Sequence, residues 1–360
     1  MTTPVDWDFA QRVAERFSRR EQATDAYHHE TLVADFHELT AEAEQLVAAE
    51  TGLVSNAGPA RARVADRSMW IGANIASFQR LLRPLTDKMA EKFDKQGPLA
   101  GLTRRAGGAE VGIVLGWMST RVLGQYDLLI IEEERPDDQD IVYYVGPNIL
   151  ALERKHGFPP REFRLWLALH ETTHRAQFTG VPWLRGYFLS LVEETLDEID
   201  PDPQRLLDAA KKILEARRRG EDALDGGLAV LLATERQREV LDRISGMMSL
   251  LEGHGDVTMD RAGEGRVPNA ERFASVLRRR RNSARGVSRL FQKLIGIEAK
   301  LNQYAAGEAF IAAVEEAGGP ELLNRAWEGP ENLPSMSEIR EPALWIERIR
   351  TGADPAALAG

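Results

Sequence analysis

Cysteine is absent from this chain, and its absence removes several kinds of chemistry at once. Disulfide bonds, thiolate metal sites and cysteine nucleophiles are all excluded. A zinc ion would therefore have to be held by histidine and carboxylate side chains.

Long apolar segments are missing as well. No apolar run reaches the roughly 18 residues that a transmembrane helix needs. The N-terminal segment MTTPVDWDFAQRVAERFSRR lacks the apolar stretch of a signal peptide. From these two observations we expect a cytoplasmic protein without a membrane partner.

Positive charge is in deficit, with 46 Lys and Arg residues against 56 Asp and Glu residues and a formal net charge of −10. This balance argues against a general nucleic-acid binder, which needs a basic surface. One basic run stands out, Arg278 to Arg281, flanked by Arg272, Arg285 and Arg289. A solvated helix face is the usual explanation of such a run. The alternative is that these arginines bind an anionic substrate or a nucleic-acid phosphate.

Helix-like spacing of apolar residues dominates the chain, whose 360 residues could form one large domain or two. No linker is long or polar enough to require separate domains. We predict a single domain, mainly α with a small β-sheet or hairpin. Its expected parts are an N-terminal helical part (1–125), a hairpin (126–146), central helices (147–265) and a C-terminal helical part with a wrapping tail (266–360).

Strand-like composition is confined to one region. Leu128–Ile131 and Ile141–Val145 are rich in β-formers and predict a hairpin joined by the polar loop from Arg135 to Asp140. Before it, the turn signal Asn56–Pro59 predicts the start of a helix that runs through Val64 to Phe78. The glycine-rich stretch Gly101–Gly112 predicts a loop that leads into a helix over 114–123.

Residues 170–174 read His-Glu-Thr-Thr-His, an HExxH motif inside a predicted helix. Helical spacing of four residues puts His170 and His174 on one face, where both imidazoles can reach one metal ion. Glu171 lies between them and can take a proton from metal-bound water. The apolar ladder through Trp166 and Phe178 places both histidines on the buried face. A pair of core histidines bonded to carbonyl groups is the alternative explanation.

A catalytic zinc needs a third protein ligand. The long histidine version of the motif is excluded, because Gln177 and Gly180 occupy the relevant positions. Glu193 or Glu194 has a suitable spacing, but these residues share a face that is typical of solvated acidic residues. Glu252 continues an apolar ladder and points inward, so we favour it as the ligand. The alternative is a helix that ends at Gly253 and leaves Glu252 partly exposed.

Several segments together resemble a known family. HETTHRAQF, Pro182-Trp183-Leu184, LLEGHGDVTMD and the segment from Lys300 to Gly307 are similar to the zincin-like metallopeptidase type 2 family, and the similarity covers nearly the whole chain to Trp345. Some of its members are labelled as hydrolases or as proteins associated with deazaflavin-coenzyme biosynthesis. The resemblance implies a zincin-like metal site on a helix-rich body. It also supports Glu252, since glutamate zincins place their third ligand in a similar segment.

One residue departs from that pattern. Arg175 directly follows the second histidine, where zincin peptidases usually carry an uncharged residue. A buried arginine at this position would need a carboxylate partner.

These residues predict a hydrolase of amide or peptide bonds. Zinc held by His170, His174 and Glu252 would lower the pKa of bound water to about 7, with Glu171 as the general base. His254 and Tyr304 are the candidates for stabilising the oxyanion.

The substrate would be a peptide or an amide-containing small molecule. If Ile141–Val145 formed an edge strand, it would line the cleft and pair with an extended substrate. The alternative function is a non-catalytic protein that uses the zincin fold to bind a partner or small molecule, with or without a metal.

Overall fold

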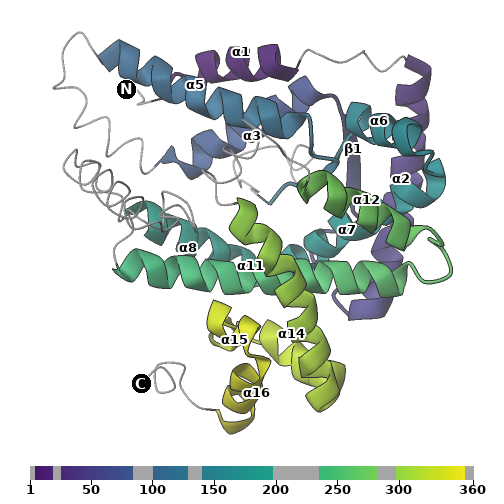
Figure 1. Ribbon diagram of the computed structural model, residues 1–360, viewed down its shortest axis with the longest axis vertical. Coiled ribbons are helices and arrows are strands. Elements are labelled where there is room, and N and C mark those ends of the chain that lie inside the picture. The colour runs from purple at the N-terminus through teal and green to yellow at the C-terminus, as the bar shows by residue number, and fades with distance from the viewer. Residues whose placement is uncertain are drawn as a thin grey trace. The chain divides into compact units, whose positions relative to one another are not determined.

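A computed structural model describes residues 5–18, 26–83, 100–128, 140–197, 235–282 and 297–352 (Figure 1). The described chain is mainly helical and contains one three-stranded sheet, which confirms the predicted fold class. It divides into two compact units, residues 1–180 with 258–273 and residues 181–257 with 274–360. The single-domain description of the chain stays a prediction.

The first unit contains the sheet and the helix of the HExxH motif. Its elements are α1 (Trp7–Ser18), α2 (Ala26–Thr51), β1 (Arg61–Ala65), α3 (Arg67–Leu81), α5 (Ala100–Ser119), β2 (Gly124–Tyr126), β3 (Ile141–Val145), α6 (Gly146–His156) and α7 (Pro160–Gly180). Two further helices, α11 (Glu235–Ala262) and α12 (Ala270–Asn282), have residues in both units. The strand order is β1-β3-β2, with β1 parallel and β2 antiparallel to β3.

Helices cover both faces of the sheet, and this accounts for the burial of every residue of β3. Ile141, Tyr143 and Val145 belong to a core cluster with residues of α1, α3 and α5. On the other face Tyr144 stacks on Phe36 of α2, with ring centroids 3.8 Å apart, and its hydroxyl bonds to that of Thr40 at 2.8 Å. A strand buried on both faces is apolar throughout rather than alternating, as IVYYV is.

An antiparallel pair of β2 and β3 is present, and only Leu128 of the predicted first strand falls among the described residues. β2 covers Gly124–Tyr126, Leu128 lies outside it, and residues 129–131 are outside the described part of the chain. The expectation that Ile141–Val145 could form an edge strand is wrong, because β3 lies between β1 and β2. Pairing with β1, a partner distant in sequence, makes β3 the central strand.

The strand β1 was not predicted, since Val64 was assigned to the following helix. The structure starts that helix at Arg67, where Asp66 accepts a hydrogen bond from the Met69 amide at 2.7 Å and caps the N-terminus. Residues 61–65 instead pair with β3. The aspartate was the local signal for this boundary.

The expected loop over Gly101–Gly112 is also wrong, because these residues lie within the continuous helix α5. Its glycines allow α1 to lie directly alongside (Figure 1). A Cβ atom at Gly108 would be 2.4 Å from the carbonyl oxygen of Asp6, and one at Gly112 would be 2.4 Å from that of Ala10. Glycine here serves close helix packing, which outweighs its poor helix propensity.

The second unit contains the C-terminal helices. Its remaining elements are α8 (Leu184–Asp197), α14 (Ile297–Asn324), η3 (Arg325–Trp327), η4 (Pro330–Asn332), α15 (Met336–Arg340) and α16 (Pro342–Thr351). Its core includes Leu250 of α11, Phe310 of α14 and Trp345 of α16. Helix α14 is kinked at Gly318-Gly319-Pro320, where Gly319 has a φ of 73°.

The sequence after Pro330 folds onto this core. The indole of Trp345 donates to the Asn332 carbonyl at 2.8 Å, and buried Arg348 pairs with Glu338 at 2.6 Å. Among the helices of the described ranges, none has the length and apolar character to cross a lipid bilayer.

The contact between α1 and α5 can be tested with Gly112→Ala. We expect a loss of stability of about 1–3 kcal/mol, because the new methyl group would meet the backbone of Ala10 rather than a movable side-chain end. Chemical denaturation would measure it. The control is Gly72→Ala in α3, where no atom lies within 4 Å of the new methyl group. It should be neutral or stabilising by up to about 1 kcal/mol, and equal losses in both variants would contradict the packing explanation.

Candidate metal centre

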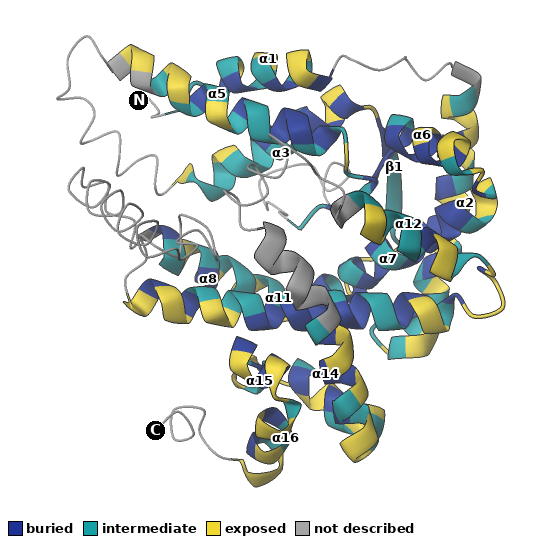
Figure 2. Cartoon of the chain, in the orientation of Figure 1, coloured by how far each residue is buried: buried dark blue, intermediate teal, exposed yellow. Residues whose placement is uncertain are grey.

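Helix α7 carries the HExxH motif through the interior of the first unit, and most of its residues are buried (Figure 2). It begins at Pro160, and proline at a helix start lacks only an amide hydrogen that has no helical partner. The two threonines between the histidines are fully buried. Thr172 donates to the Ala168 carbonyl at 2.6 Å and Thr173 to the Leu169 carbonyl at 2.7 Å, so both hydroxyls are satisfied within the helix.

His170 and His174 are neighbours on one side of α7. Their ring centroids are 4.7 Å apart and the ring planes are nearly perpendicular, at 87°. Both side chains are half-buried, whereas Leu169, Glu171 and Thr173 beside them are buried. Neither histidine residue is thus fully buried, as both would be in a core histidine pair.

Glu252 lies on α11, which continues without a break to Ala262. The alternative of a helix end at Gly253 is therefore wrong. Gly253 instead allows a close helix contact, because a Cβ atom there would be 2.4 Å from the carbonyl carbon of Gly307 in α14. A glycine beside the glutamate thus serves backbone packing and leaves the helix intact.

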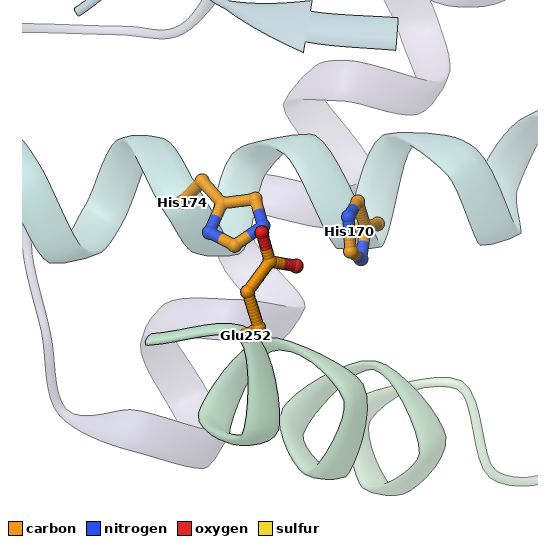
Figure 3. A group of neighbouring side chains, drawn as sticks. All are labelled: His170, His174 and Glu252. Atoms are coloured by element: carbon orange, nitrogen blue, oxygen red, sulfur yellow. The ribbon is translucent and has the colours of Figure 1, made fainter. Parts of the chain in front are cut away.

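His170, His174 and Glu252 form a group that could hold a metal ion (Figure 3). One ligand atom from each residue lies within 4.8 Å of the other two. Tetrahedral zinc with bonds of about 2.1 Å needs ligand atoms about 3.4 Å apart, which small side-chain rotations can reach. Two imidazole nitrogens and one carboxylate oxygen are a donor set that suits zinc.

Helix geometry supports the same placement of Glu252. Met259 follows it by seven residues, about two turns, and so lies on the same side of α11. Met259 is buried. Gly263, just after the end of α11, lies close to α7, since a Cβ atom built on it would be 3.3 Å from Cδ1 of Leu169. Glu252 thus lies on the same stripe of α11 as buried Met259.

Glu193 and Glu194, the other candidates for the third metal ligand, have different surroundings from Glu252. Glu194 pairs with Arg236 at 2.9 Å and with Arg243 at 2.8 Å, and Glu193 is exposed. Among the described residues, the group able to hold a metal contains Glu252 and neither of these two.

The carboxylate of Glu171 is buried against strand β2. A Cβ atom built on Gly124 would be 2.5 Å from its Oε1 atom, so a larger residue there would displace the carboxylate. The charge also reaches Tyr144 on β3. Burial raises the pKa of the Tyr144 hydroxyl most strongly, its hydrogen bond with Thr40 lowers it, and the charge of Glu171 raises it further.

Arg175 is fully buried and has the carboxylate partners that its position requires. Its guanidinium contacts Asp140 at 2.7 Å and Glu44 at 2.5 Å, and donates to the Gly58 carbonyl at 2.7 Å. Burial opposes its charge, but the hydrogen bond and the charge of Asp140, with the charge of Glu44, outweigh burial and raise the pKa of the guanidinium.

Of the two proposed oxyanion stabilisers, His254 has a described side chain, and it is not part of the group of His170, His174 and Glu252. His254 follows Glu252 by two residues, about 200° around the helix, and its buried ring lies edge-on to Trp327 at 5.2 Å. Tyr304 falls within α14, but its side chain is outside the described residues. Their catalytic role stays a prediction.

The arginine run lies on α12. Arg278 and Arg279 are exposed, and Arg279 donates to the Ser275 hydroxyl at 3.0 Å, while the side chain of Arg281 is outside the described residues. This exposure favours the interpretation as a solvated helix face.

Gly124 and the carboxylates that pair with Arg175 were not recognised from the sequence. Gly124 precedes a short strand and carries no motif, and Glu44 is distant from the histidines along the chain. Only the position of Arg175 gave a signal, the need for a carboxylate partner.

A family model described as zincin-like metallopeptidase matches residues 5–346. The chain belongs to this family. A crystal structure from Chloroflexus aurantiacus, described as a candidate hydrolase with a novel fold, is 33% identical, with a TM-score of 0.72 over 96% of this chain and 99% of that one. A comparison with proteins of curated function finds no match. The membership confirms the resemblance that the sequence motifs suggested.

The structural role of the Arg175 cluster can be tested with Arg175→Met. We expect a loss of stability of about 3–5 kcal/mol, because Asp140 would keep a buried charge without its guanidinium. The control is Arg161→Met on the same helix, whose pair with Glu38 is exposed on both sides, 59% and 63%. It should change stability little. Equal urea midpoints for the two variants would contradict a structural role of the buried cluster.

Proposed function

We propose that this protein is a zinc-dependent hydrolase of peptide or amide bonds. The observation that supports this most directly is the group of His170, His174 and Glu252, next to a buried carboxylate, Glu171, on the same helix as the histidines. The family membership gives the same class of chemistry.

The roles of the residues follow from their donor atoms. His170, His174 and Glu252 would hold the metal, and zinc bound there supplies a Lewis acid that lowers the pKa of a coordinated water to about 7. Glu171 would take a proton from the attacking water and return it to the leaving nitrogen. Its carboxylate is held against Gly124, which limits its movement.

An extended substrate would bind along strand β2. The sequence had assigned this role to Ile141–Val145, the strand β3. The Asp127 amide donates to the Ile141 carbonyl, and the Val145 amide donates to the Leu123 carbonyl. In and beside β2, the odd-numbered residues therefore bond to β3. The alternation of an antiparallel ladder then directs the backbone N–H and C=O of Gly124 away from β3. A peptide that added to this side of β2 would lie beside Glu171.

The other proposal from the sequence, a non-catalytic zincin fold, differs in measurable properties. A binding protein needs neither a bound metal nor Glu171, whereas the hydrolase needs both.

Glu171→Gln should retain zinc and lower the rate of hydrolysis by about 100-fold or more, because the amide cannot accept the proton. The substrate would be a mixture of unstructured peptides, with new amino termini counted by mass spectrometry. Zinc content would be measured by elemental analysis after expression with added zinc.

His170→Ala is the partner variant and should lose the zinc itself. Wild-type protein without zinc, or full peptide cleavage by Glu171→Gln, would contradict the proposed function. Zinc bound without cleavage of any peptide would favour the non-catalytic alternative.

Gly124→Ala tests the position of the base. The methyl group would displace the flexible carboxylate end of Glu171, so we expect kcat to fall by about 100-fold with zinc content and folding retained. Gly186→Ala in α8, with no atom within 4 Å of the added methyl group, is the control and should keep full activity. Unchanged kcat in Gly124→Ala would show that strand β2 does not position Glu171.

A further inference from the structure

Gln177 contacts one of the histidines of the metal group. Its Oε1 atom lies 3.0 Å from Nδ1 of His174, three residues earlier on α7. The Gln177 side chain has no exposed surface, so water cannot replace this contact. The sequence had pointed to Gln177 only as a position that excludes a third histidine ligand.

The two nitrogens of the His174 ring therefore have different partners. In Figure 3 one ring nitrogen of His174 faces Glu252 and the other points away from it. Since Nδ1 bonds to Gln177, the nitrogen that faces Glu252 is Nε2.

The tautomer of His174 decides whether it can bind a metal. A neutral imidazole carries its proton on one nitrogen and a lone pair on the other. An amide oxygen accepts a hydrogen bond and so favours the proton on Nδ1, which leaves the Nε2 lone pair for a metal. Partners of this kind typically contribute about 10- to 100-fold to metal affinity.

We propose that Gln177 is a positioning residue that holds His174 in the Nδ1-protonated tautomer and in the orientation of a metal ligand. Its relevance to catalysis rests on the proposed function, but the tautomer is a property of the metal-free protein too. Because the amide is neutral, Gln177 fixes the ring without adding a buried negative charge beside Glu171.

The test compares Gln177→Met, Gln177→Glu and Thr173→Val. Methionine keeps the length of the side chain but cannot accept the hydrogen bond, whereas glutamate keeps the acceptor. Thr173→Val removes a different buried hydrogen bond from the same helix and serves as the control for stability. Chelator competition would measure zinc affinity, and thermal unfolding would measure stability.

We expect zinc affinity to fall about 10- to 100-fold in Gln177→Met and to recover in Gln177→Glu. Thr173→Val should keep its zinc affinity at a similar loss of stability. A zinc affinity for Gln177→Met within about twofold of wild type would overturn the proposal.

The second measurement does not depend on zinc. Nitrogen NMR of metal-free protein labelled at histidine reports the tautomer of His174. A His174→Ala variant would identify its signals. Wild type should show Nδ1–H, and Gln177→Met should shift toward Nε2–H.

An Nε2–H ring in wild type would overturn the assignment of Gln177. An Nδ1–H ring in a protein that binds no zinc would leave Gln177 as the determinant of the tautomer, while the proposed hydrolase function would fail.

Discussion

The burial of helix α7 is the constraint on which the candidate site depends. Burying a charged side chain on such a helix is costly unless the charge has a partner. Near its start Arg164 pairs with buried Glu153, and beyond the histidines Arg175 pairs with Asp140. These ion pairs flank the motif and hold the helix by contacts specific to one register and orientation.

Close contacts at two glycines complete this arrangement. Gly124 brings strand β2 against the carboxylate of Glu171, and Gly253 brings α14 against the helix that carries Glu252. A side chain at either position would occupy the space of a neighbouring carboxylate or backbone. The two glutamates of the candidate site are therefore positioned by neighbouring glycines, which have no side chain.

Local patterns predicted the helices better than the strands. The apolar ladder through Trp166 and Phe178 identified helix α7, and the IVYYV run identified β3. β1 was missed because pairing with a distant strand creates it, and β2 is too short to show an alternating pattern. The continuous helix over Gly101–Gly112 was missed because glycine has a low helix propensity. Propensity takes no account of the close packing of α1 against these glycines.

The sequence by itself determined the helical character of the chain, the HExxH residues on one helix face and the absence of thiolate ligands, because these follow from composition and from spacing within one element. It also favoured Glu252, through a stripe on its own helix. Only the tertiary structure brings Glu252 rather than Glu194 near the histidines and makes β2 rather than β3 an edge of the described sheet. Such choices depend on contacts between elements, which spacing along one helix or strand does not specify.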